Sequence, residues 1–93
     1  MISRDGNQYK LEGPVTVHTA RAMMEAGQVM FDSGEIVVDL GGVSEVDSSA
    51  VSIMLEWMRR SSQKGQTMRF INLPVNLCNL ASLYGVLDLI PHA

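Results

Sequence analysis

Apolar and polar positions along the chain form short blocks whose period changes between that of a strand and that of a helix. Near the amino terminus, Tyr9 and Leu11 alternate with polar residues, and Asp5-Gly6-Asn7 separates this arm from an earlier one. Turn residues between two such arms predict a β-hairpin from Ile2 to Glu12. Gly13-Pro14 is expected to end the second arm, because proline cannot donate a hydrogen bond to a central strand.

The next block has the period of a helix. From about Val17 to Asp32, apolar residues recur every three or four positions and polar residues take the other side, which predicts one amphipathic helix ended by Ser33-Gly34. A run of apolar and β-branched residues from Glu35 to Leu40 then predicts a buried strand. Gly41-Gly42 is expected to end this strand.

The most strongly amphipathic helix is predicted from Ser48 to Lys64, ended by Gly65. Its expected core stripe consists of Val51, Met54, Leu55 and Met58. Ile53 and Trp57 project away from this stripe, beside Ala50, as a second apolar patch. Two interpretations stay open: the patch packs under a neighbouring loop or sheet edge, or it binds a partner, since tryptophan is enriched at interface anchors.

The last strand is predicted from Thr67 to Ile71, and Pro74 stands in the favoured first turn of a third helix that Gly85 ends. The apolar stripe expected on that helix is Leu77, Leu80, Leu83 and Tyr84. Strands that alternate with helices imply right-handed βαβ units and parallel pairing. The pattern therefore predicts an α/β fold, as a single domain over residues 1–93, with a small, mixed, mainly parallel sheet of about four strands and three packed helices.

Composition and charge narrow the class of protein. A chain of 93 residues with 46% apolar and 18% charged residues is typical of one globular domain. A net charge of −3, with Arg59-Arg60 as a lone basic pair, argues against nucleic-acid binding. The amino terminus lacks the apolar core of a signal peptide and no apolar run has membrane-spanning length, so a cytoplasmic protein without direct membrane insertion is expected.

No catalytic constellation emerges from the sequence. His18 is not placed near a nucleophile, and Ser48 does not lie in a G-x-S-x-G motif. Asp39, Glu45 and Asp47 could be imagined as a metal or acid–base site, but a strand end, an exposed loop residue and a helix cap explain them better. The sequence therefore predicts no enzyme activity, cofactor or metal site.

Asp47 and Ser48 stand at the junction of the central strand and the long helix. Their side-chain oxygens can accept hydrogen bonds from the first N–H groups of the helix, so a cap alone can explain them. Ser48 is also a candidate phosphorylation site. A phosphate there would gain from the helix dipole, although it would meet the like charge of Glu45 and Asp47. Both interpretations stay open at this point.

Residues 39–51, which read Asp-Leu-Gly-Gly-Val-Ser-Glu-Val-Asp-Ser-Ser-Ala-Val, resemble the signature of STAS domains. In that family a strand ending in D-L leads through a loop to V-D-S-S/T-G at the start of a helix. The resemblance covers nearly the whole chain. It implies a mixed sheet wrapped by helices, and a non-enzymatic protein that binds a nucleotide-hydrolysing partner. Ala50 departs from the pattern, since many members have glycine there.

Two branches of the family are similar to this chain. One is the small cytoplasmic STAS subunit of Mla-type phospholipid ABC transporters, which maintain the lipid asymmetry of the outer membrane. That subunit is similar to this chain in length, and it too stops soon after its last helix. Its last helix carries a pattern like Leu80-Ala81-Ser82-Leu83-Tyr84-Gly85. The other branch contains the anti-sigma factor antagonists, which a partner serine kinase phosphorylates on the first hydroxyl residue after the motif aspartate. That residue is Ser48 here.

The transporter branch is the favoured interpretation, and it implies docking on the ABC transporter ATPase at the inner-membrane face. The residues expected to bind the partner are Asp47, Ser48, Ser49, Ala50, Val51, Ile53 and Trp57. The alternative partner is the serine kinase that acts as an anti-sigma factor. A homodimer through Trp57 is a further use of the same apolar surface.

Overall fold

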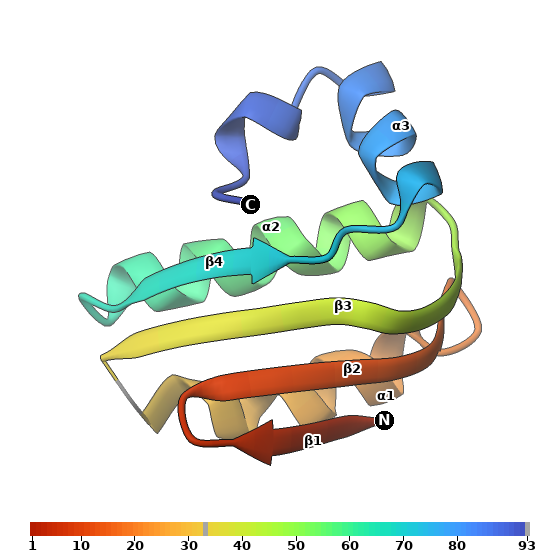
Figure 1. The fold of residues 1–93 in the computed structure, drawn as a ribbon. Helices are drawn as coiled ribbons and strands as arrows, with labels where there is room; N and C mark the ends of the chain where they lie inside the picture. Colours follow the sequence, from red (N-terminus) through yellow and green to blue (C-terminus); the bar gives the residue numbers. More distant parts are fainter. Residues whose placement is uncertain (33, 93) are drawn as a thin grey trace.

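A four-stranded mixed sheet, in the order β1-β2-β3-β4, forms the centre of the computed structural model, which describes residues 1–32 and 34–92 (Figure 1). β1 (Ile2–Asp5) and β2 (Gln8–Val15) form an antiparallel hairpin. β3 (Glu35–Val46) runs parallel to β2, and β4 (Thr67–Ile71) runs parallel to β3. The predicted hairpin and mainly parallel sheet are confirmed.

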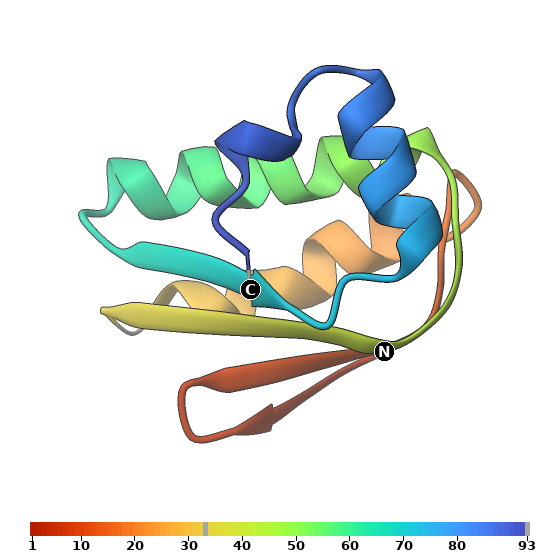
Figure 2. The same cartoon turned by 45° about the horizontal axis from the view of Figure 1, so that its top comes forward.

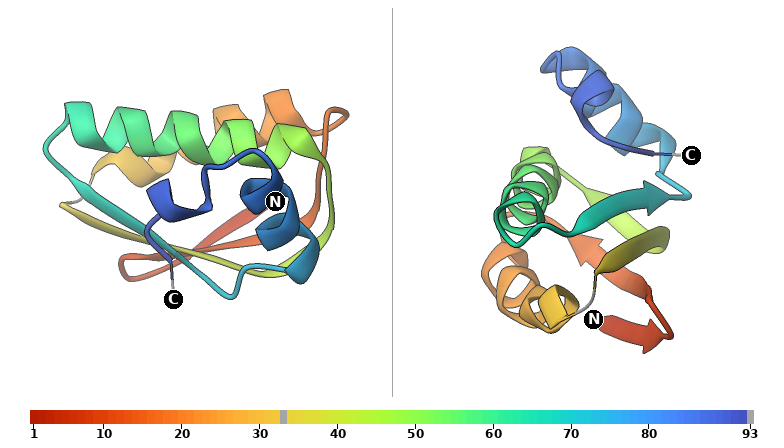
Figure 3. Two further views of the ribbon diagram at one scale, coloured as in Figure 1. Left: turned by 90° about the horizontal axis from the view of Figure 1, so that it is seen from above. Right: turned by 90° about the vertical axis from the view of Figure 1, so that its left-hand side faces the viewer.

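Two helices cover one face of this sheet (Figure 3). α1 (Ala20–Ala26) connects β2 to β3 and continues as the 3₁₀ helix η1 (Gly27–Asp32), and α2 (Ser48–Gln63) connects β3 to β4. Both crossovers advance across the sheet in the same direction, so right-handed connections place both helices on the same side.

The third helix and the carboxyl-terminal segment lie along the β4 side of the molecule (Figure 2). α3 (Val75–Leu83) packs against α2, and a short 3₁₀ helix, η2 (Leu87–Leu89), follows it. The chain then returns to β4, where the Phe70 N–H donates to the Pro91 carbonyl at 2.8 Å and His92 forms a single parallel bridge with Phe70. Three helices on a four-stranded sheet confirm the predicted α/β architecture.

The core lies between the sheet and the helices. Its largest side chains with almost no exposed surface are Trp57, Tyr9, Phe70, Leu11, Met30, Ile36, Leu77, Ile90 and Val38. Trp57 lies between α2 and the start of η1, where a β-carbon on Gly27 would come within 2.5 Å of the indole Cζ2 atom. Glycine at this position therefore allows the two helices to approach each other closely.

Two strands are longer than the sequence indicated, and their predicted ends are wrong. β3 continues through Gly41-Gly42 to Val46, because its second half pairs with the end of β2. β2 likewise continues through Pro14 to Val15. The contact of β2 with the amino-terminal segment stops at Glu12, whose N–H donates to the Met1 carbonyl. Beyond that point β2 has a paired strand on one side only, where proline is tolerated.

The helices also differ from the prediction in detail. The first begins at Ala20 instead of Val17 and changes to a 3₁₀ helix at Gly27, so it is shorter than one continuous amphipathic helix. Ser33, part of its predicted end, lies outside the described residues. α2 begins and ends within a residue of its prediction. On α3, Leu77 is buried but Leu83 is 77% exposed, so the predicted stripe is wrong at its carboxyl-terminal end.

Candidate functional site

The Asp47 carboxylate joins two segments that are 30 residues apart in sequence. Asp47 has extended backbone angles and precedes α2, and its Oδ1 accepts a hydrogen bond from the Ser49 N–H at 2.8 Å. Its Oδ2 accepts a hydrogen bond from the Val17 N–H at 2.9 Å. One side chain thus caps α2 and fixes the loop after β2 beside it, which confirms the predicted cap.

These hydrogen bonds also set the charge of the site. The bond from the Val17 N–H is the main reason that the pKa of Asp47 lies below its ordinary value, and the bonds from Ser49 lower it further. Asp47 therefore stays ionised at neutral pH, beside the positive end of the α2 dipole. His18, which follows Val17 in the loop, lowers the pKa of Asp47 further through its charge.

Ser48 is the first residue of α2 and its side chain is exposed. It borders an open groove of about 470 Å³ between α1 and the amino-terminal half of α2. The lining residues are Ala20, Arg21, Met24, Ser48, Ser49, Ser52, Ile53 and Glu56. The groove combines an apolar floor with hydroxyl groups and charges at its rim, which is the composition of many protein-binding surfaces. The Ser48 side chain is accessible from solvent at the rim of this groove.

The loop after β2 is held in place by its own threonines. The Thr19 hydroxyl donates to the Pro14 carbonyl at 2.9 Å and accepts from the Thr16 N–H at 3.0 Å. The Thr16 hydroxyl accepts from the His18 N–H at 3.3 Å. With the bond from Asp47, these contacts order the loop, although Val17 is 65% exposed at its tip. An ordered apolar tip beside Ser48 is suited to contact a partner.

The residues expected to bind a partner separate into two groups. Asp47, Ser48 and Ser49 lie at the accessible amino terminus of α2. Ala50 and Val51 face the core.

The prediction that Ile53 and Trp57 form an exposed apolar patch is wrong. Ile53 is 3% exposed and lies at the floor of the groove, and Trp57 is 0% exposed. Because α2 is flanked by α1 on one side and α3 on the other, its buried arc is wider than the stripe the sequence indicated. The alternative interpretation is that the two side chains pack under a neighbouring loop or at the sheet edge. They are indeed packed inside the fold, but Trp57 lies against Gly27 of η1 and not under a loop.

Sequence reasoning missed the neighbours that the fold brings to Ser48. Val17, His18, Arg21 and Met24 all come from the loop after β2 and from α1. The signal was present in the topology, because the carboxyl ends of parallel strands meet at one edge of a sheet. The loops after the second and third predicted strands therefore had to be neighbours.

The other two acidic residues considered as a metal or acid–base site do not join Asp47. Asp39 Oδ1 accepts bonds from the Gly41 N–H at 2.8 Å and the Asn72 amide at 3.0 Å, and Asn72 is the main cause of its lowered pKa. Glu45 lies on β3, not in a loop, and its side chain is exposed. In residues 1–32 and 34–92, no three histidine, cysteine or acidic side chains are grouped so that they could hold a metal ion.

Among the helices of the described residues, none has the length and apolar character needed to cross a membrane.

Comparison with known proteins identifies what this chain is similar to. A family model described as "Mlab, STAS domain" matches residues 2–91. No curated protein matches the chain.

Solved structures share the fold at low sequence identity. The anti-sigma factor antagonist SpoIIAA in its unphosphorylated form is 15% identical with a TM-score of 0.77, over 100% of this chain and 86% of that one. A putative anti-sigma factor antagonist from Thermotoga maritima is 12% identical with a TM-score of 0.81, over 99% and 83%. The phosphorylated form of the Bacillus cell fate determinant SpoIIAA is 17% identical with a TM-score of 0.66, over 100% and 89%.

Proposed function

The chain belongs to the STAS domain family, and the family model that it matches is described as "Mlab, STAS domain". We propose that it is a non-enzymatic accessory subunit of an Mla-type phospholipid ABC transporter. In this role it binds the ATPase subunit at the cytoplasmic face of the inner membrane and stabilises or regulates it. The match of the family model over residues 2–91 is the observation that carries the proposal.

The docking surface that we propose is the amino terminus of α2 with the adjoining loop and groove. Ser48 and Ser49 supply hydroxyl and backbone groups, Val17 supplies an exposed apolar contact, and Arg21 and Met24 line the opposite wall. Asp47 acts through its neighbours, because its two hydrogen bonds hold the loop and the helix terminus in one arrangement. Trp57 has no place in this surface, since it is buried.

A pull-down with the tagged chain from a detergent-solubilised lysate of the native cells, followed by mass spectrometry, tests the identity of the partner. Recovery of an ABC-type ATPase together with its membrane permease supports the proposal. Recovery of a small serine kinase without any transporter component contradicts it and supports the alternative described below.

Bulky substitutions then test the surface itself. Ser48→Trp should weaken binding of the recovered ATPase at least about tenfold, because an indole at the centre of an interface blocks close packing. Ser82→Trp is the matched control, since Ser82 is an exposed serine on α3. Equal affinity of the two variants in a titration would exclude the amino terminus of α2 as the docking surface.

A second candidate function is an anti-sigma factor antagonist that a partner kinase switches off by phosphorylating Ser48. Two observations support it: the exposed Ser48 hydroxyl at a helix amino terminus, and the shared fold of the antagonists. A phosphate at that position adds up to about two negative charges beside Asp47.

The charge-mimicking variant Ser48→Asp tests the switch. If the chain is an antagonist, Ser48→Asp should abolish binding to its kinase partner, whereas Ser48→Ala should retain binding and resist phosphorylation. Full binding by Ser48→Asp would count against this function.

A further inference from the structure

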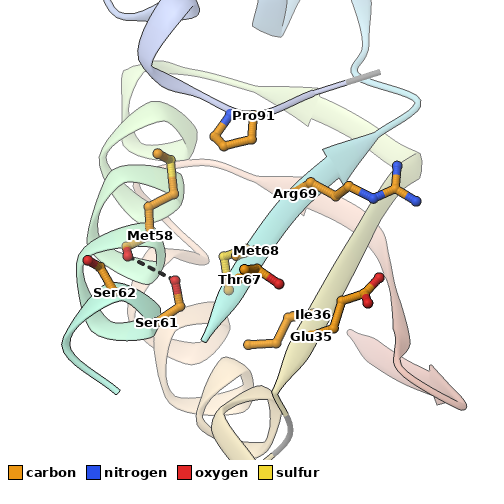
Figure 4. Close-up of a pocket in the computed structure, with 9 residues that line it drawn as sticks. All are labelled: Glu35, Ile36, Met58, Ser61, Ser62, Thr67, Met68, Arg69 and Pro91. Carbon is orange, nitrogen blue, oxygen red and sulfur yellow. Dashed lines mark hydrogen bonds between the residues drawn. The ribbon is translucent and has the colours of Figure 1, made fainter. Parts of the chain in front are cut away.

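A second groove lies at the opposite end of α2, along the outer edge of β4 (Figure 4). It has a volume of about 490 Å³, and its lining comes from the carboxyl-terminal half of α2, the start of β3, β4 and Pro91. Met58 and Ser61 of α2 face Met68 of β4 across it, and both sides are largely apolar. The groove is separate from the surface around Ser48, whose lining residues it does not share.

The edge of β4 is only partly paired in the described residues. β4 is the last strand of the sheet, and the Phe70 N–H donates outward to the Pro91 carbonyl. Residues two positions apart in a strand direct their N–H and C=O groups to the same side. The N–H and C=O groups of Met68 therefore also point outward, into the groove, where no described residue pairs with them.

An exposed strand edge with unpaired donor and acceptor groups is a template for another strand. An extended peptide satisfies both groups of Met68 at once and can place apolar side chains against Met58. An acyl chain would fill the apolar space but would leave the two polar groups of Met68 buried without partners, which is costly. The chemistry of the groove therefore favours a peptide over a lipid.

The charged side chains at the groove indicate which charge a bound peptide should carry. Two charged side chains line the groove: Glu35, at the start of β3, and Arg69, whose guanidinium points away from α2 (Figure 4). Because β4 lies between β3 and the open edge, a side chain on a strand added at that edge would lie next to Arg69 and farther from Glu35. Arg69 has no ion pair within the described part of the chain. A second copy that paired edge to edge through β4 would place two Arg69 side chains on the same face of adjacent strands, and like charges there are destabilising. An acidic side chain on the added strand would instead pair with Arg69.

We propose that the groove beside β4 binds an extended, acidic peptide segment of a partner protein, which adds a short strand at Met68 in line with the chain's own carboxyl-terminal bridge. This surface is independent of docking at Ser48, so the chain has one binding surface at each end of α2.

The test uses the ¹⁵N-labelled full chain and an acetylated, amidated pentapeptide, Thr-Val-Glu-Val-Thr. We expect the Met68 amide signal to move downfield and its hydrogen exchange to slow at least about tenfold on saturation, because its N–H gains a strand partner. The same peptide with lysine in place of glutamate should bind at least about threefold more weakly. The Arg69→Glu variant should instead bind the lysine peptide more tightly than the glutamate peptide.

Arg4→Glu is the matched control, because Arg4 is an exposed arginine on β1, the strand at the other edge of the sheet, and it lines neither groove. The chain with this substitution should still bind the glutamate peptide more tightly than the lysine peptide. Ser48→Asp should also bind the peptide as the unmodified chain does, even where it loses the partner of the Ser48 surface.

Three results would overturn the proposal: no change at Met68 with either peptide, a shift of Met68 that follows protein concentration alone, or saturation of the groove by decanoate but not by peptide. The second result would indicate a second copy of the chain, and the third an acyl ligand.

Discussion

The carboxylate of Asp47 shows how much of the site depends on one residue. Its two oxygens accept bonds from the Ser49 and Val17 N–H groups, so the start of α2 and the loop after β2 share a single anchor. Ser48 follows Asp47 directly, so the two bonds also help to fix the backbone from which the Ser48 side chain projects. Asp47 is thus a positioning residue for the surface that carries Ser48.

Two substitutions of Asp47 distinguish the effect of its capping hydrogen bond on stability from the effect of its negative charge. Asp47→Ala should lower the melting temperature by several degrees at pH 7, whereas Asp47→Asn should lower it less, because asparagine is also a favourable cap. The pKa of Asp47 is lowered in the folded chain, so the stability it provides is present above the ordinary aspartate pKa and is lost as the pH falls through the lowered value. Melting curves at pH 7 and at about pH 3 should therefore show a smaller gap between the unmodified chain and Asp47→Asn in acid. A gap that does not change with pH would contradict the role of the charge.

Gly27 is the second position where one residue decides the packing. A β-carbon there would lie 2.5 Å from the Trp57 ring, which is fully buried and cannot move aside freely. Gly27→Ala should reduce the free energy of unfolding by about 1–3 kcal/mol through overpacking. Gly34→Ala is the matched control, because nothing lies within 4 Å of its added carbon. Urea unfolding measures both variants, and equal stabilities would show that η1 and α2 are not in close contact at Gly27.

At the scale of elements, the ends of strands and helices follow pairing and packing more than local sequence. Gly41-Gly42 has the composition of a strand end, yet β3 continues through it because β2 offers a partner as far as Val46. α1 has one amphipathic pattern, yet it narrows to a 3₁₀ helix where it meets Trp57. Local signals predicted that these elements exist, and tertiary contacts decided where they end.

The two glycines of β3 have different roles, which a pair of substitutions can separate. A β-carbon on Gly42 would lie 2.9 Å from the Leu11 carbonyl, which is backbone, at the shift in register between β2 and β3. A β-carbon on Gly41 would meet Asp39 Oδ1 at 3.1 Å, and a shift of that side chain by a few tenths of an ångström relieves the contact. Gly42→Ala should therefore cost about 1–3 kcal/mol in urea unfolding and Gly41→Ala clearly less. The reverse order would place the strained position at Gly41.

At the scale of the whole molecule, the carboxyl-terminal segment completes the core. Ile90 is 2% exposed, and the following residues pair with Phe70 on β4. Ile90→Ala should reduce the free energy of unfolding by about 2–4 kcal/mol, because a buried side chain is truncated in a closely packed interior. Leu89→Ala is the control, since Leu89 is 64% exposed and its change should stay within about 0.5 kcal/mol. Equal effects in chemical denaturation would mean that the segment does not contribute to the core.

The architecture could be predicted from the sequence because alternating strands and helices permit few topologies. The cap at Asp47 could be predicted too, since it depends on neighbours in sequence. The bond from Val17 to Asp47 and the burial of Trp57 could not be read from periodicity, because both depend on which helices flank α2. The partner at Ser48 and its phosphorylation stay predictions.

The contact between Trp57 and Gly27 gives the protein an optical reporter of its own. The chain has one tryptophan, so all of its intrinsic indole fluorescence arises where α2 meets the start of η1, directly after α1. A ring shielded from water should emit at short wavelength and resist quenching by acrylamide. A ligand that moves α1 against α2 would change this emission, whereas a strand added at β4 would leave it constant. A titration followed by tryptophan emission can therefore distinguish a ligand bound at the Ser48 end of α2 from one bound beside β4.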